Sequence, residues 1–409
     1  MRKKVMIIGG GASGLTAAIA SARAGADVMV LEHMDRVGKK ILSTGNGRCN
    51  LTNLTMDASC YRSDNPDFPM KILDRYSIWE TLTLFEDLGI ITKSKNGYIY
   101  PNSEQASAVL DTLRLETARL NVTVITNCNI QKLYKKDGSF FAETDQMNVQ
   151  ADAVILATGS KAAPHTGSDG SGYELAKRFG HHIIRPLPAL VQLRCAEKHF
   201  RELAGIRCEA RITLAVGEQI LAEDQGELQL TDYGLSGIPT MQVSRYAAVA
   251  LAEGKRVTAY LDFLPSQSYE ETEKFLSQRV EKMGCRTAGD LLIGVLNKKL
   301  VGLLLKLAKI PANCPVSEVE ETAWSRLFAL IKAFRANVTA TNSFDQAQVC
   351  RGGVDTREVS PRTLESRIVS GLYLVGELLD VDGICGGYNL QWAWSTGMIA
   401  GAEAGRDCV

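Results

Sequence analysis

The fold is decided near the start of the chain, by the stretch Val5-Met6-Ile7-Ile8-Gly9-Gly10-Gly11-Ala12-Ser13-Gly14. Its apolar residues are typical of a short buried strand, and its glycines follow the spacing G-x-G-x-x-G at Gly9, Gly11 and Gly14. We expect the first glycine to allow a tight turn and the second to let the backbone approach a pyrophosphate. The third would let the following helix pack closely on the strand.

The residues after the glycines complete a strand–helix–strand unit. Apolar residues recur at helical spacing from Leu15 to Ala22, and residues 27–31 form a second expected strand that ends on Glu32. The start of the helix offers free N–H groups to phosphates, and Glu32 can accept hydrogen bonds from a ribose diol. This order predicts a Rossmann-like dinucleotide site. Because an NADP 2′-phosphate would meet the Glu32 carboxylate, NAD and FAD are the two cofactors that fit here.

A second cradle is predicted near the other end of the chain. Residues 151–159 form a buried-strand pattern that ends in a small-residue turn, and residues 371–377 repeat this design with a glycine and an acid at the end. The glycine-rich turn 382–389 then opens an expected helix from about 390 to 402. One molecule long enough to contact both cradles is FAD, with its pyrophosphate and adenosine at the first and its ribityl chain and ring at the second.

Three further motifs carry a resemblance to a known family. They are Ser43-Thr44-Gly45-Asn46-Gly47-Arg48-Cys49-Asn50-Leu51-Thr52-Asn53, Arg351-Gly352-Gly353-Val354 and Gly387-Tyr388-Asn389-Leu390-Gln391-Trp392-Ala393-Trp394. Over essentially the whole chain, the sequence resembles the GRCN-motif flavoproteins of the two-dinucleotide-binding-domain class, which include BaiN-type bile-acid reductases and aminoacetone oxidases. The resemblance implies an FAD-dependent oxidoreductase that binds its cofactor without a covalent link.

The residues expected to bind FAD come from the cradles and from the resemblance together. They are Gly9, Gly11, Ala12, Ser13, Gly14, Glu32, Lys40, Gly45, Asn46, Gly47, Arg48, Cys49, Asn50, Ala157, Thr158, Gly159, Gly376, Glu377, Gly387, Asn389 and Leu390. Arg48 and Asn50 are expected to hold the flavin or the loop backbone. The Arg48 cation could lower the pKa of the Cys49 thiol, but no cysteine stands at C-x-x-C spacing, so dithiol chemistry is not expected. The sequence assigns no catalytic acid or base and no metal site.

The fold class implied by the resemblance is α/β: a Rossmann-like FAD-binding domain with an inserted β-barrel-like domain and a small helical domain. The residue patterns favour the same division. Short alternating runs broken by turn residues between about 190 and 262 predict an antiparallel sheet or barrel. Helical spacing follows, with a possible capping box at Ser268 and Glu271. We expect the FAD-binding domain at 1–189 and 345–409, the barrel at 190–265 and 334–344, and the helical domain at 266–333.

Composition and charge narrow the class of protein. Of 409 residues, 45% are hydrophobic and 22% charged, and 46 basic residues balance 46 acidic ones. A net charge of zero argues against a dedicated nucleic-acid binder. No stretch approaches the ~20 apolar residues that span a bilayer, and the early glycines disfavour a signal peptide. With ten scattered cysteines, we expect a cytoplasmic enzyme with a small-molecule substrate and no membrane or nucleic-acid partner.

Several reactions remain open at this point. The preferred one is NAD(P)H-dependent reduction of an activated C=C bond in a steroid- or bile-acid-like enone. The alternatives are an oxygen-using FAD amine oxidase of the aminoacetone type and, more remotely, an NAD-dependent dehydrogenase without flavin. A redox sensor or RNA-modification protein is disfavoured by the neutral charge. No second glycine fingerprint follows Gly159, so NADH or NADPH would dock only transiently over the flavin.

Overall fold

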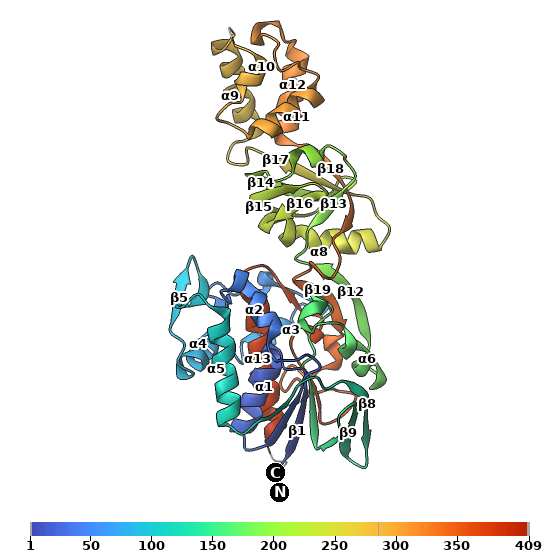
Figure 1. The fold of residues 1–409 in the computed structure, drawn as a ribbon. Coiled ribbons are helices and arrows are strands. Elements are labelled where there is room, and N and C mark those ends of the chain that lie inside the picture. The colour runs from blue at the N-terminus through green and yellow to red at the C-terminus, as the bar shows by residue number, and fades with distance from the viewer. Residues whose placement is uncertain (1, 285, 407–409) are drawn as a thin grey trace. The chain divides into compact units, whose positions relative to one another are not determined.

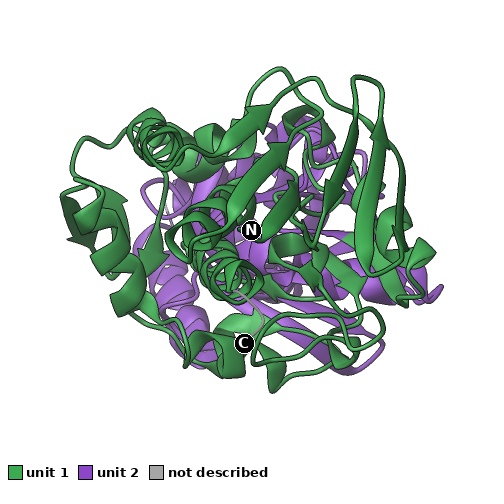
Figure 2. Ribbon diagram, turned by 90° about the horizontal axis from the view of Figure 1, so that it is seen from below, with its two compact units in different colours: residues 1–187, 348–409 green, residues 188–347 purple. Residues whose placement is uncertain are grey.

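The structure is a computed structural model that describes residues 2–284 and 286–406, so Cys285 and Cys408 lie outside the described residues. The chain divides into two compact units. Unit 1 is Met1–Leu187 with Gln348–Val409, and unit 2 is Pro188–Ala347 (Figure 2). The further division of the insert into a barrel domain and a helical domain stays a prediction.

The centre of unit 1 is a five-stranded parallel sheet in the order β20-β11-β1-β2-β7. Its strands are β1 (Lys4–Ile8), β2 (Asp27–Leu31), β7 (Thr123–Ile125), β11 (Ala153–Leu156) and β20 (Leu372–Leu374). All four residues of β11 are buried, as expected for a strand with covered faces. The predicted Rossmann-type order of strand, glycines, helix and strand is confirmed. Because the strands are parallel, their carboxyl ends meet along one edge of the sheet.

Two helices that are distant in sequence lie side by side in unit 1 (Figure 1). They are α1 (Ala12–Arg23) and α13 (Tyr388–Gly405). Three glycines of α13 touch the main chain of α1, and a Cβ on any of them would displace it. The contacts pair Gly397 with Ser13, Gly401 with Ala17 and Gly405 with Ser21. The contact residues of both helices increase in residue number together, in steps of four, so the two helices run parallel and closely packed.

Smaller elements complete unit 1. Its other strands are β3 (Thr52–Asn53), β4 (Tyr61–Arg62), β5 (Thr92–Lys95), β6 (Tyr98–Pro101), β8 (Ile130–Lys136), β9 (Ser139–Thr144), β10 (Asn148–Ala151), β12 (Ile183–Ala189), β19 (Val349–Val354) and β21 (Asp382–Gly383). Its other helices are α2 (Lys39–Ser43), α3 (Phe68–Leu73), α4 (Ile78–Asp87), α5 (Ala106–Arg119) and α6 (Ser171–Arg178). Short 3-10 turns are η1 (Thr44–Gly47), η2 (Ala58–Cys60), η3 (Pro164–Thr166), η5 (Thr356–Glu358) and η6 (Gly376–Leu378).

Unit 2 is built around a closed antiparallel barrel in the order β13-β16-β15-β14-β17-β18. The strands are β13 (Leu193–Cys195), β14 (Arg207–Val216), β15 (Gln219–Thr231), β16 (Gly234–Gly237), β17 (Val257–Asp262) and β18 (Phe334–Thr341). Along β18, Phe334, Ala336 and Val338 are buried while the residues between them are exposed. This alternation fills the barrel from inside. The predicted inserted barrel is confirmed.

The helices of unit 2 are α7 (Phe200–Leu203), α8 (Ile238–Ala252), α9 (Tyr269–Lys282), α10 (Ala288–Leu291), α11 (Lys298–Ala308) and α12 (Glu321–Lys332), with the 3-10 turn η4 (Val316–Glu318). The capping box at the start of α9 is confirmed: Glu271 N donates to the Ser268 hydroxyl, and Ser268 N donates to the Glu271 carboxylate. Helix α8 was not predicted. Most of its buried residues are small or polar, so it lacks the apolar stripe that identifies a helix in a sequence.

Candidate cofactor-binding site

The turn between β1 and α1 is closed tightly around its glycines. A Cβ on Gly9 would stand 2.5 Å from the Ala157 carbonyl oxygen, and one on Gly14 would overlap the Gly9 carbonyl oxygen. A Cβ on Gly11, by contrast, would meet no atom within 4 Å. Gly11 is the N-cap of α1 and provides no capping side chain. The first N–H groups of α1 are therefore available to a ligand, which is the usual arrangement at a pyrophosphate site.

Glu32, at the end of β2, is buried beside this turn and holds two loop amides. Gly10 N and Met34 N donate to its two carboxylate oxygens, each at 2.8 Å. A carboxylate has lone pairs beyond these two bonds. Glu32 thus fixes the glycine turn directly and keeps acceptor capacity for a ribose.

The turn after β11 packs against both the first cradle and helix α6. Ala157 contacts Gly9 and Gly14, as the distances above imply. The Thr158 hydroxyl is buried without a hydrogen-bond partner among the described residues and lies against Gly172, where a Cβ would clash with it. Gly159 faces Ser168. The three predicted residues of this turn therefore stand at the carboxyl edge of the sheet, beside the α1 N-terminus.

The late glycine–acid pair meets a lysine from the start of the chain. Glu377 Oε2 accepts hydrogen bonds from Lys40 Nζ at 2.6 Å and from the Ser160 hydroxyl at 3.0 Å. Lys40 and Glu377 side chains are 25% and 17% exposed, so the ion pair is only partly open to solvent. Trp392 Nε1 donates to the Gly376 carbonyl oxygen at 2.9 Å. Lys40, Ser160 and Glu377, which are far apart in the sequence, therefore meet at the Glu377 carboxylate.

The GRCN turn folds through a run of left-handed residues. Gly45, Asn46, Gly47 and Cys49 have φ values of +55°, +54°, +82° and +59°. Cys49 N donates to the Thr44 carbonyl oxygen at 3.0 Å, which closes the turn. Two non-glycine residues in this conformation are unusual and indicate a turn that its surroundings hold in place.

Cys49 and Arg48 occupy opposite environments. Cys49 is fully buried in an apolar cluster with Leu51 and Trp394, and burial raises the pKa of its thiol to about 12. Arg48 is exposed, with its Nε 3.8 Å from a Glu104 carboxylate oxygen. The guanidinium therefore does not activate the thiol, and Cys49 anchors the turn instead.

Asn50 and Gly387 are brought together from opposite ends of the chain. Gly387 is the N-cap of α13, has φ +96° and gives no side-chain cap. A Cβ on Gly387 would stand 2.7 Å from the Thr52 carbonyl oxygen and 3.0 Å from Asn50 Oδ1. Asn389 fixes the preceding turn, because Gly383 N donates to its Oδ1 at 2.8 Å and its Nδ2 donates to the Gly383 carbonyl oxygen.

The predicted residues therefore meet in pairs or triples within unit 1. Asn46, Gly47 and Arg48 are exposed, and Arg48 N donates to the Gly45 carbonyl oxygen at 3.2 Å inside the same turn. Leu390 instead packs against an apolar cluster. Sequence reasoning missed Gly10 and Ser160, which donate to the two predicted acids. Their positions, inside the glycine run and directly after Gly159, were the available signal.

A buried histidine lies in unit 1 away from these residues. His181 Nδ1 lies 3.0 Å from a Glu358 oxygen and its Nε2 2.8 Å from the Ser366 hydroxyl. Burial lowers the pKa of this imidazole despite the Glu358 carboxylate. Ser366 Oγ also accepts N–H groups of Ile368 and Val369, so the trio ties loops together rather than presenting a nucleophile. Among the described residues, no three metal-ligating side chains gather as a metal centre would require.

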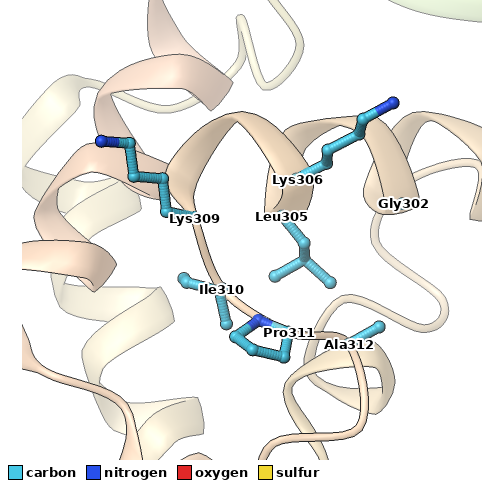
Figure 3. Close-up of a pocket in the computed structure, with 7 residues that line it drawn as sticks. All are labelled: Gly302, Leu305, Lys306, Lys309, Ile310, Pro311 and Ala312. Carbon is cyan, nitrogen blue, oxygen red and sulfur yellow. The ribbon is translucent and has the colours of Figure 1, made fainter.

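A separate hollow lies at the end of α11 in unit 2 (Figure 3). It has a volume of about 390 Å³ and is lined by Gly302, Leu305, Lys306, Lys309, Ile310, Pro311 and Ala312. Both lysine ammonium groups extend away from Leu305 and Ile310 in the close-up, so the inward-facing wall is apolar. It contains none of the predicted cofactor residues.

Comparison with known proteins now fixes the family. The model of the HI0933-like protein Rossmann domain matches residues 3–403. The chain belongs to this family. It is 48% identical over 98% of its length, and 98% of the relative's, to a 3-dehydro-bile acid delta(4,6)-reductase of Clostridium scindens. The family resemblance drawn from the three motifs is confirmed.

Two further relatives, at lower identity, carry a different name. Ribosomal RNA dihydrouridine synthases of Haemophilus influenzae and Escherichia coli are 30% and 31% identical to the chain, over 98% and 97% of it, and are covered over 98% and 96% of their own lengths. Within residues 2–284 and 286–406, no helix combines the length and apolar character of a membrane span.

Proposed function

We propose that this chain is an FAD-dependent reductase of an activated C=C bond in a steroid- or bile-acid-like enone, with NADH or NADPH as the reductant. The observation that carries the proposal is the 48% identity, end to end, to the 3-dehydro-bile acid delta(4,6)-reductase. It is supported by a Rossmann unit whose glycine cradle, buried acid and uncapped helices suit a dinucleotide.

The chemistry in the relatives' names favours a reductase over an oxidase. A 3-dehydro bile acid with a Δ4 bond is an enone, in which the C=C bond is conjugated with a carbonyl group. Dihydrouridine is a uridine whose C5=C6 bond, also conjugated with a carbonyl group, has been saturated. Both names therefore describe hydrogenation of an electron-poor C=C bond, although the substrates differ in size and charge. This shared reaction type is the reason to prefer reduction to amine oxidation.

The residues of unit 1 fit FAD rather than NAD alone. NAD bound at the first cradle would not explain the uncapped start of α13 or the unpartnered, buried Asn50 oxygen near that helix. When bound, FAD supplies hydride transfer between a nicotinamide and an organic acceptor. In this arrangement α1 would hold the pyrophosphate, Glu32 the adenosine ribose, and the Lys40–Glu377 pair the hydroxyl-bearing chain between phosphate and ring.

The decisive experiment is an anaerobic one on the purified, FAD-loaded chain. NADH and NADPH are mixed separately with the protein, and flavin bleaching is followed by absorbance. A 3-oxo-Δ4 bile acid, an amine such as aminoacetone, and oxygen are then offered. We expect bleaching by a nicotinamide and rapid recovery with the enone only. Bleaching by the amine, with recovery in oxygen, would overturn the proposal in favour of an amine oxidase.

Reduction of ribosomal RNA is a second candidate function, because two relatives that match the whole chain carry that name. The balance of 46 basic and 46 acidic residues disfavours it. The same reduced protein is incubated with unmodified ribosomal RNA under matched conditions, and dihydrouridine is measured after digestion. Dihydrouridine formation with no turnover of the enone would replace the first proposal by the second.

A further inference from the structure

Asn50 carries a buried acceptor without a partner. The side chain is 8% exposed, and its Oδ1 has no hydrogen-bond partner among the described residues. Buried amide oxygens in folded proteins are nearly always hydrogen-bonded. The turn that presents it is well fixed, because Cys49 is anchored in the apolar core and a Cβ on Gly45 would stand only 2.9 Å from Asn50 N. The oxygen is therefore held in place with no group to bind.

This oxygen is directed at the beginning of α13. It lies 3.0 Å from the position that a Cβ on Gly387 would occupy, and Gly387 is the N-cap of that 18-residue helix. No side chain caps the helix, so its first N–H groups have no side-chain acceptor. The Thr52 hydroxyl, also fully buried, has no partner in the described structure either. An unpartnered acceptor and a set of N–H donors thus meet at the start of α13, and a second unpartnered polar group belongs to the neighbouring Thr52.

The combination discriminates between ligands. An uncapped helix start alone would suit a phosphate, but a phosphate has no N–H to give to the Asn50 oxygen and would be repelled by it. A planar heterocycle with an N–H between two carbonyl groups could pair with both. Its N–H would donate to the Asn50 oxygen, and its carbonyl oxygens would accept from the N–H groups of α13. The pyrimidine edge of isoalloxazine has this pattern, with C2=O, N3–H and C4=O in order. The place therefore suits the ring of FAD and not its pyrophosphate.

We propose that Asn50 binds the flavin ring by accepting the N3–H with its Oδ1, beside the N–H groups of α13. The arrangement gives a role to a buried asparagine that a left-handed turn holds against Gly387, where a Cβ would clash with the Thr52 main chain. The inference rests on the FAD-binding part of the proposed function and is independent of which substrate is reduced.

The first test compares FAD with FAD methylated at N3, which has no hydrogen to donate there. Dissociation constants are measured by fluorescence titration of the apoprotein. We expect the wild type to bind the methylated cofactor roughly tenfold or more weakly, the usual effect of one lost hydrogen bond. Asn50→Leu keeps the bulk of the side chain and removes the acceptor, so it should bind both cofactors equally. A purely steric effect of the methyl group would persist in Asn50→Leu and would overturn the proposal.

The second test needs no apolar substitution in a buried site. Asn50→Asp keeps an acceptor and adds negative charge beside a ring that gains negative charge on reduction. We expect a more negative two-electron reduction potential than in the wild type, measured by equilibration with a reference dye. Asn148→Asp, exposed on β10, is the matched control and should leave the potential unchanged. An unchanged potential in Asn50→Asp would overturn the proposal, since a merely structural asparagine would not move it.

The outcomes separate this inference from the proposed function. If the wild type binds FAD and reduces an enone while both Asn50 variants behave like it, only the inference fails. If the Asn50 signatures are found but no enone is reduced, only the substrate assignment fails. A wild type that takes up no FAD would overturn both.

Discussion

Glu32 shows, at the scale of one residue, how a predicted ligand also supports the fold. Its carboxylate accepts the N–H groups of Gly10 and Met34 inside the glycine turn. The sequence predicted an acid at the end of the second strand from the spacing alone, because the strand–helix–strand unit is local. The hydrogen bonds from Gly10 N and Met34 N were not predicted, because they depend on how the turn closes in three dimensions.

We expect Glu32→Ala to weaken FAD binding roughly ten- to a hundredfold, because a charge-assisted hydrogen bond to the ribose is lost. The apoprotein should also lose about 1–3 kcal/mol of unfolding free energy, because two amides lose their acceptor. Fluorescence titration and chemical denaturation measure the two effects, with Glu281→Ala, exposed on α9, as the control. Unchanged affinity would mean that Glu32 serves the loop only.

Cys49 is a residue whose position in a motif suggests reactivity and whose environment prevents it. With burial raising the pKa of its thiol to about 12, the group stays protonated throughout the neutral range. Cys49→Ser should therefore keep most of the turnover and the pH profile of the wild type, while unfolding at lower denaturant because a hydroxyl replaces a thiol in an apolar cluster. Loss of turnover with FAD still bound and reducible would make Cys49 catalytic.

Among the secondary-structure elements, the predictions succeeded where the signal was local. The first strand–helix–strand unit and the alternating strands of the barrel follow from spacing within a few residues. Helix α8 was missed because its buried face is made of residues such as Thr240, Ser244 and Ala247, which form no apolar stripe. The meeting of Asn50 with Gly387 also could not be predicted from the sequence, because the two residues are far apart in the chain and meet only in the folded unit.

The contact between α1 and α13 gives a prediction about two elements. A Cβ on Gly401 would overlap the Ala17 carbonyl oxygen, which is main chain and cannot move without moving α1. Gly401→Ala should therefore destabilise the protein by about 1–3 kcal/mol and weaken FAD binding with it. On the exposed face of α11, a Cβ on Gly302 meets no atom within 4 Å, so Gly302→Ala should be neutral or slightly stabilising. Thermal unfolding of both variants, with and without FAD, decides the point.

For the whole molecule, every predicted cofactor residue lies in unit 1, and unit 2 contains the barrel and its helices. The insertion of one unit into the other was expected from the family resemblance and from the alternating runs between about 190 and 262, followed by helical spacing. No substrate-binding residues were predicted, because residues 188–347 carry no motif with recognisable chemistry.

This division predicts where FAD should slow amide hydrogen exchange. Binding contributes free energy to the unit that holds the ligand. We expect protection in peptides that cover 9–14, 44–50 and 385–391, and little change in α11 and α12, when FAD is added to the apoprotein. Mass spectrometry of quenched, digested samples provides the comparison. Protection concentrated in α11 or α12 would contradict the assignment of the cofactor to unit 1.

The contacts between the glycines of α13 and the small residues of α1 also fix the distance between the N-termini of the two helices. Because Ser13 is level with Gly397, α13 begins about eight residues before α1 does, and at 1.5 Å per residue their two free N-termini are offset by ~12 Å along the helix axes. The glycines recur every four residues, so the helices could slip past each other only by a full step of ~6 Å. Such a slip would carry one terminus out of hydrogen-bonding range of a cofactor held at the other. If FAD binds as proposed, the helix pair would fix the distance between the groups that hold its phosphates and the groups that hold its ring.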